Sequence, residues 1–145
     1  MASESNHEDA VARISREFQK KGYSVQTRGN NLPTKSRRSA AIYRPDLLVR
    51  KGDQLVWIVE VETSEAGKAV VGAAILADIC MEIERQKGEQ VAKPNLLFIF
   101  YRGTPNLGLA TKRLPKLMTR ISHLGDIRAL TEAQAVLEIS KMPNV

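Results

Sequence analysis

Three carboxylates have the types and spacing to do chemistry together: Asp46, which follows Pro45, and the pair Glu60 and Glu62. Side chains two residues apart on a strand point to the same side, so Glu60 and Glu62 converge. Such a group repels itself unless protons or a cation intervene. Hard oxygen ligands suit Mg²⁺ or Mn²⁺, and a cation of this kind can activate water for phosphodiester hydrolysis. The alternative, that these acids simply face water at the end of a strand, stays open.

A β-hairpin is needed to bring the three carboxylates together. Residues 43–50 and 54–62 have strand character, and Lys51-Gly52-Asp53 between them is typical of a hairpin turn. A turn at this point places Asp46 opposite residue 59 or 60. Alternation along residues 54–62 predicts two faces: Leu55, Trp57, Val59 and Val61 on one, and Val56, Ile58, Glu60 and Glu62 on the other. We therefore expect one notch lined by Asp46, Glu60 and Glu62.

The remaining elements follow from periodicity and from start and stop residues. The pattern predicts a helix over 6–21 capped by Asn6, a strand over 23–28, a loop over 29–41 and a helix over 67–85. It further predicts a strand over 95–101, helical residues 104–124 in two pieces with Pro115 beginning the second, and a strand over 127–130. Thr131 and Gln134 form a capping box that opens a last helix. The order αβββαβαβα indicates one α/β domain over 1–145, with a mixed five-stranded sheet flanked by helices.

The helix over 67–85 is apolar on nearly every side. A helix with this pattern is usually buried all round. We expect part of its surface to be covered by a second copy of the chain, in a homodimer.

The charge distribution favours a nucleic-acid partner. The chain carries a net charge of +6. Residues 20–51 contain nine Lys and Arg but a single acidic residue, Asp46. In the loop over 30–41, which we expect to be flexible, Lys35, Arg37 and Arg38 suit phosphate contacts, as does Arg28 before it. Aromatic residues are few, which favours duplex or branched DNA over single strands. A solvated cationic surface is the alternative interpretation.

Composition excludes several other classes. Cys80 is the single cysteine, so the chain has no disulfide framework, and with His7 and His123 as the two histidines we expect no zinc site. The N-terminus lacks the features of a signal peptide, and no apolar run is long enough to span a bilayer. A cytoplasmic protein is expected.

The motif Pro45-Asp46, thirteen residues, then Glu60-Val61-Glu62 resembles the PD-(D/E)xK nuclease superfamily, which has the restriction endonuclease-like fold. Within it the chain is most similar to archaeal Holliday junction resolvases, through its order of elements and its basic loop. The resemblance implies that Asp46 and Glu60, with the carbonyl of Val61, ligate metal. It also implies a further acidic ligand from the first helix, for which Glu8 is the choice over Glu17.

The chain departs from this family at one position, because Glu62 stands where the motif has Lys. Some restriction endonucleases of the superfamily use Glu there, and Lys68 could alternatively supply a displaced ammonium group; a solvated Lys68 is the ordinary alternative. The leading hypothesis is a Mg²⁺- or Mn²⁺-dependent DNA endonuclease. The others are a catalytically silent fold that binds DNA or protein, and a subunit of a larger assembly.

Overall fold

The computed structural model describes residues 2–34, 40–63, 67–87, 92–101 and 107–145. Within these ranges the strands β1 (Ser24–Gln26), β2 (Leu47–Lys51), β3 (Gln54–Glu62), β4 (Asn95–Phe100) and β5 (Ile127–Thr131) form one sheet in the order of the chain. β1 pairs with β2, and β2 with β3, in antiparallel fashion, whereas β3, β4 and β5 run parallel to one another. The sheet is therefore mixed, because the two crossovers to parallel strands each pass through a helix.

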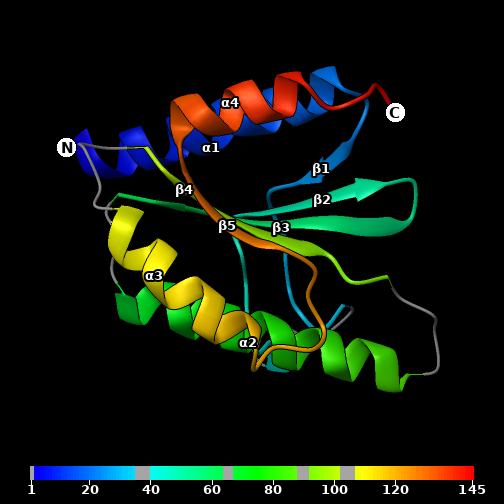
Figure 1. Cartoon of the computed structure of the whole chain (residues 1–145). Helices are drawn as coiled ribbons and strands as arrows, with labels where there is room; N and C mark the ends of the chain where they lie inside the picture. The colour runs from blue at the N-terminus through cyan, green and yellow to red at the C-terminus, as the bar shows by residue number, and fades with distance from the viewer. Residues whose placement is uncertain (1, 35–39, 64–66, 88–91, 102–106) are drawn as a thin grey trace.

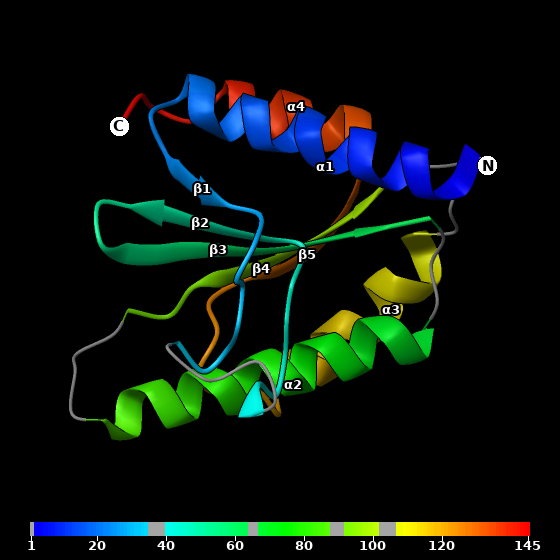
Figure 2. The same ribbon diagram turned by 180° about the vertical axis from the view of Figure 1, so that it is seen from behind.

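Helices cover both faces of this sheet (Figures 1 and 2). α1 (Ala2–Lys20) and α4 (Glu132–Ser140) lie on one face, and α2 (Gly67–Gln86) and α3 (Leu107–Met118) lie on the other. The α/β class and the five-stranded mixed sheet flanked by helices agree with the sequence prediction. None of the described helices combines the length and apolarity needed to cross a membrane.

Each face of the sheet has its own hydrophobic core. Alternate residues of β3 divide between them: Ile58 packs with α2 and α3, and Val59 and Val61 pack with α1 and α4. The α1 stripe of Ala10, Ile14 and Phe18 is fully buried in the second core. This double coverage makes the inner strand β4 buried from Leu96 to Phe100, as its continuous apolar run predicts.

A β-bulge in the hairpin changes the predicted faces of β3. Val49 pairs with Trp57, but the next residue, Arg50, pairs with Leu55, so Val56 is an extra residue on β3. Leu55 therefore packs on the α2 side and Val56 on the α1 side, the reverse of simple alternation. From Trp57 onward the predicted faces are correct.

β2 begins at Leu47, four residues later than predicted. Pro45 has no N–H for a ladder, and Tyr43 instead forms an isolated bridge with Leu32. Leu32 is fully buried and Asn30 nearly so, which shows that residues 30–34 pack against the protein, in contrast to the free loop that the sequence predicts. Lys35, Arg37 and Arg38 lie outside the described residues.

Two helix boundaries differ from the prediction. α1 begins at Ala2, so Asn6 lies inside the helix and is not its cap; Ala and Glu among residues 2–5 have high helix propensity. α3 is one helix ending at Met118, with Pro115 inside its last turn. A proline there has no N–H to donate to the carbonyl four residues earlier, so the helix lacks one backbone hydrogen bond in its last turns. The predicted capping box is confirmed, since Thr131 and Gln134 exchange side-chain and backbone hydrogen bonds at the start of α4.

Within the single chain α2 is buried along one stripe and not all round. Val70, Ala74, Ala77 and Met81 pack into the core, but Ile75, Leu76 and Ile79 are 45%, 36% and 39% exposed. The excess of apolar residues therefore lies on the surface of the single chain, and the homodimer that the sequence predicts to cover it stays a prediction.

Candidate functional site

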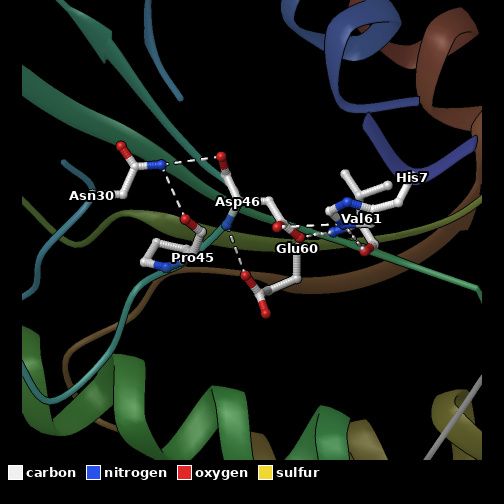
Figure 3. A network of polar contacts seen from close by, with 6 residues as sticks. All are labelled: His7, Asn30, Pro45, Asp46, Glu60 and Val61. Carbon is white, nitrogen blue, oxygen red and sulfur yellow. Dashed lines mark hydrogen bonds and ion pairs between the residues drawn. The ribbon is translucent and has the colours of Figure 1, made fainter. Parts of the chain in front are cut away.

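The hairpin register sets Asp46 directly across from Glu60. Leu47, the first residue of β2, pairs with Val59 of β3. Because the two strands are antiparallel, Asp46, which precedes Leu47, faces Glu60, which follows Val59. The Asp46 N–H donates to Glu60 Oε1 at 2.9 Å, and the Val61 N–H donates to Asp46 Oδ2 at 2.8 Å (Figure 3). These two N–H groups lie beyond the end of the β2–β3 ladder and need acceptors, which the carboxylates supply. The predicted juxtaposition of Asp46 and Glu60 is confirmed.

His7, which belongs to α1, lies next to Asp46 and Val61 (Figure 3). Its Nε2 atom lies 3.1 Å from the Val61 carbonyl oxygen and 3.4 Å from Asp46 Oδ1. The sequence analysis did not place this histidine in the site. Helical spacing carried a signal, however, because His7 lies three residues before Ala10 and seven before Ile14, on the stripe that faces the sheet.

Asn30 fixes the backbone that carries Asp46. Its Nδ2 donates at 3.0 Å to the carbonyl oxygens of both Pro45 and Asp46 (Figure 3). The Asn30 side chain is buried, and among the described residues its Oδ1 atom has no hydrogen-bond partner. The sequence predicts this residue as part of a loop, and nothing in its local pattern indicates that it packs under the Pro45-Asp46 segment.

These groups open into a cleft of about 540 Å³. Its described lining includes His7, Asp46, Glu60 and Val61, and is completed by Glu8, Arg44, Glu62, Thr63 and Tyr101. The three predicted carboxylates thus line one cleft, with Glu8 at its exposed rim. Arg44 was not among the predicted site residues.

Burial and mutual repulsion raise the pKa values of the two glutamates. The pKa of Glu60 rises to about 8, first because burial disfavours the charged carboxylate and second because Asp46 is close; the hydrogen bond from the Asp46 N–H opposes this. Burial also raises the pKa of Glu62, with a further contribution from Asp46, while His7 acts in the opposite direction. The cluster therefore carries less negative charge at neutral pH than its composition indicates.

Tyr43 lies close to Glu60. Its hydroxyl is buried and forms no hydrogen bond with the described residues, and burial, followed by the charges of Glu60 and Asp46, raises its pKa strongly. The phenol is near enough to influence the Glu60 carboxyl electrostatically. A neutral hydroxyl in this position offers a hydrogen-bond donor to Glu60 when the carboxylate ionises.

The remaining predicted residues divide into three groups. Arg28 lines a second groove next to the cleft. Lys68 lies in the first turn of α2, and the position of its side chain is outside what the structure describes. Lys35, Arg37 and Arg38 also lie outside the described residues.

The donor atoms at the cleft fit a divalent cation in their chemistry and spacing. Three donor atoms are close together: His7 Nε2 lies 3.1 Å from the Val61 oxygen and 3.4 Å from Asp46 Oδ1. Neighbouring ligands on an octahedral ion with bonds of about 2.1 Å are about 3 Å apart. Within the described part of the chain no three His, Cys, Asp or Glu side chains are close enough to hold an ion, so the three carboxylates do not gather at one point. The gathered set is two side chains and a main-chain oxygen.

No protein-family model matches this chain, and no curated protein matches it significantly in sequence. The resemblance to PD-(D/E)xK nucleases therefore rests on the motif residues themselves.

Proposed function

We propose that this protein is a divalent-metal-dependent DNA endonuclease that hydrolyses phosphodiester bonds in duplex or branched DNA. The observation that supports this most strongly is the interlocked pair of Asp46 and Glu60 at the open end of the hairpin, with Asp46 Oδ1 and the Val61 oxygen gathered around His7 Nε2. Acidic oxygens and a strand carbonyl in a polar cleft are the ligands that Mg²⁺ or Mn²⁺ prefers.

The groups that would hold the metal are the gathered set, namely Asp46 Oδ1, the Val61 carbonyl oxygen and His7 Nε2. The Glu60 carboxylate, which accepts from the Asp46 N–H, would lie next to them. When bound, the cation supplies charge stabilisation at the phosphoryl group and a lowered pKa for its water. Its charge also favours the ionised form of Glu60, whose pKa is about 8 in the protein alone.

The remaining groups of the cleft act on the substrate directly. The Arg44 guanidinium, which lines the cleft, suits hydrogen bonds to the non-bridging oxygens of the scissile phosphate. Glu62 occupies the Lys position of the motif and can accept the proton of the attacking water, because burial and Asp46 raise the pKa of its carboxyl. Asn30 keeps the Asp46 backbone in place during these steps.

A catalytically silent DNA-binding protein is the second candidate. One observation favours it: among the described residues that line the cleft there is no lysine, and Glu62 stands in the motif's lysine position. A cleft of this composition could bind metal and DNA and still lack an ammonium group for the reaction.

We also propose that two copies associate through the exposed face of α2. Ile75, Leu76 and Ile79 lie on one side of this helix, together with Gly72, whose Cα faces open space. Residues spaced by three and four positions form a continuous stripe, and a small residue allows a close approach of two helices. A symmetric dimer would present two clefts, one for each DNA strand.

The decisive experiment incubates supercoiled plasmid and a synthetic four-way junction with Mg²⁺, Mn²⁺ or EDTA. The unmodified protein should cut in either metal and not in EDTA. Asp46→Asn, which keeps an acceptor for the Val61 N–H, should slow cutting by about 100-fold or more, since loss of a metal ligand raises the barrier by several kcal/mol. Asp53→Asn, an exposed carboxylate in the hairpin turn, is the matched control and should cut normally.

Three outcomes decide between the candidates. Equal cutting in EDTA, or by Asp46→Asn, contradicts the metal-dependent reaction. Binding of labelled DNA with no cutting in either metal supports the silent protein. Absence of both binding and cutting excludes both candidates.

A further inference from the structure

A second groove adjoins the cleft and shares three of its residues. The groove has a volume of about 640 Å³ and runs between α1 and the segment that follows β1. His7, Glu8 and Asp46 line both hollows, so the candidate metal ligands lie where the two meet. Beyond them the described walls of the groove combine polar and basic side chains, Ser15, Arg16, Gln19, Thr27 and Arg28, with the apolar Val11, Ala12 and Pro45.

The described arginines differ in whether their guanidinium groups interact with other groups of the protein. Arg13, Arg50, Arg120 and Arg128 each donate to a protein acceptor, and Arg85 also interacts with the protein. By contrast, within the described residues, the guanidinium groups of Arg16, Arg28 and Arg44 have no hydrogen bond or ion pair. These three are the arginines that line the two hollows.

The contrast is sharpest on α1, where two arginines are three residues apart. Arg13 forms a bidentate pair with Glu132 of α4, with both nitrogen–oxygen distances at 2.7 Å. Arg16, one turn later, is exposed and lines the groove without a partner among the described residues. An unpaired guanidinium offers five donors in a fixed plane, a geometry that matches two oxygens of a phosphate.

The order of charges along the two hollows also suits a nucleic-acid strand. Arg44, Glu60 and Glu62 line the cleft alone, Asp46 and Glu8 line both hollows, and Arg16 and Arg28 line the groove alone. A phosphate chain that passes through both hollows is attracted by arginines in each of them, and a cation offsets the negative charge of the carboxylates. Among its described lining residues the groove has no Phe, Tyr or Trp on which a base could stack, so these walls suit the sugar–phosphate backbone.

We propose that this groove is the path of the DNA strand that leaves the cleft, with Arg16 and Arg28 each contacting one of its phosphates. The assignment rests on the proposed function and names the part of the substrate that the protein grips outside the reacting phosphate. These contacts are made to the backbone, so they add affinity for all sequences alike.

The test measures DNA affinity across a salt series for the double variant Arg16→Ala/Arg28→Ala. The measurements use a synthetic duplex, Mg²⁺ and an Asp46→Asn background, so that the DNA is not cut. Loss of two phosphate contacts should lower the slope of log binding constant against log salt by about two units and weaken binding by at least about 10-fold. The matched control, Lys51→Ala/Lys141→Ala, removes two exposed charges at the hairpin turn and after α4 and should leave the slope unchanged.

A second readout locates the contacts on the DNA. Replacing single phosphates by neutral methylphosphonates should weaken binding at two positions on one side of the cutting site. In the double variant these two positions should lose their effect. Both arginines are exposed, so the melting temperature should be unchanged and a loss of affinity should not reflect unfolding.

The outcomes separate this inference from the proposed function. If the unmodified protein cuts DNA and the double variant keeps the full salt slope, the groove assignment is wrong and the nuclease stands. If the slope falls as expected but the unmodified protein cuts no DNA, the groove stands and the nuclease is wrong. Equal losses in the double variant and in the lysine control would also overturn the groove, because they would reflect net charge alone.

Discussion

Glu60 is the residue whose ionisation connects the site to the stability of the fold. Its carboxyl has a pKa of about 8 in the folded protein, against an ordinary value of 4.5 for a glutamate in an unfolded chain. The folded state therefore holds this proton more tightly. The stabilisation is fully present below about pH 4.5 and is lost as pH rises through about 8, so without metal the fold should weaken over this window.

The variant Glu60→Gln tests this linkage because it removes the ionisation and keeps the shape. In EDTA at pH 8.5 we expect its free energy of unfolding to exceed that of the unmodified protein by about 1 to 3 kcal/mol, with little difference at pH 5. Urea titrations at both pH values measure this. Glu82→Gln, an exposed carboxyl on α2, should show no such pH dependence. A Gln variant that is equally destabilised at both pH values would show that ionisation of Glu60 does not cause the pH dependence.

His7 is the residue that distinguishes this site from a purely carboxylate one. An imidazole nitrogen favours Mn²⁺ over Mg²⁺, because Mg²⁺ prefers oxygen ligands. We expect His7→Ala to weaken Mn²⁺ binding by about 10-fold or more in calorimetric titrations and to affect Mg²⁺ less. His7→Gln keeps a donor for the Val61 oxygen and should restore thermal stability but not Mn²⁺ affinity. Wild-type Mn²⁺ affinity in both variants would mean that His7 has a structural role alone.

At the scale of elements, the β2–β3 hairpin and the segment before it together position Asp46. The hairpin supplies the register, and Asn30 holds Pro45 and Asp46 beyond the point where the ladder ends. Without that support Asp46 would sit on an unpaired strand extension, because Pro45 donates no hydrogen bond. The position of the carboxylate thus depends on a residue that lies sixteen positions away in the chain.

The exposed face of α2 gives a prediction at the same scale. If two copies associate there, Ile75→Lys/Ile79→Lys should convert a dimer into a monomer in sedimentation velocity, because charged side chains oppose burial. Both residues are more than a third exposed in the single chain, so the monomer should keep its melting temperature. Leu137→Lys, on the exposed side of α4, is the control and should remain dimeric. An unmodified protein that sediments as a monomer would rule out this interface.

At the scale of the whole molecule, the sheet separates two kinds of surface. The face covered by α1 and α4 brings His7, Arg16 and the groove to the edge where β2 begins, and the other face leaves the α2 stripe open. The cleft lies beside α1, where Asp46 and Glu60 meet at the open end of the hairpin. The proposed DNA-binding surface and the proposed dimer interface therefore share no residues.

Local rules were enough to determine much of this arrangement from the sequence. The spacing between Asp46 and Glu60 and the Gly52 turn fix the hairpin register, since a register is set by the turn that closes it. The capping box at Thr131 involves residues three apart and is determined just as locally. The continuous apolar run of β4 likewise indicates its burial on both faces.

Tertiary structure alone decided the rest, because it depends on which surfaces meet across long separations in the chain. His7 contacts a carbonyl 54 residues away, and Asn30 reaches under a segment whose position the hairpin sets. The bulge at Val56 places Leu55 and Val56 on the faces of the sheet opposite to those predicted. It arises from the pairing of β3 with β2, which alternation within one strand does not reveal. The open side of α2 depends on how much of the helix the sheet covers. The periodicity of a sequence shows which face of a helix is apolar. Whether another element covers that face depends on the packing of the whole fold.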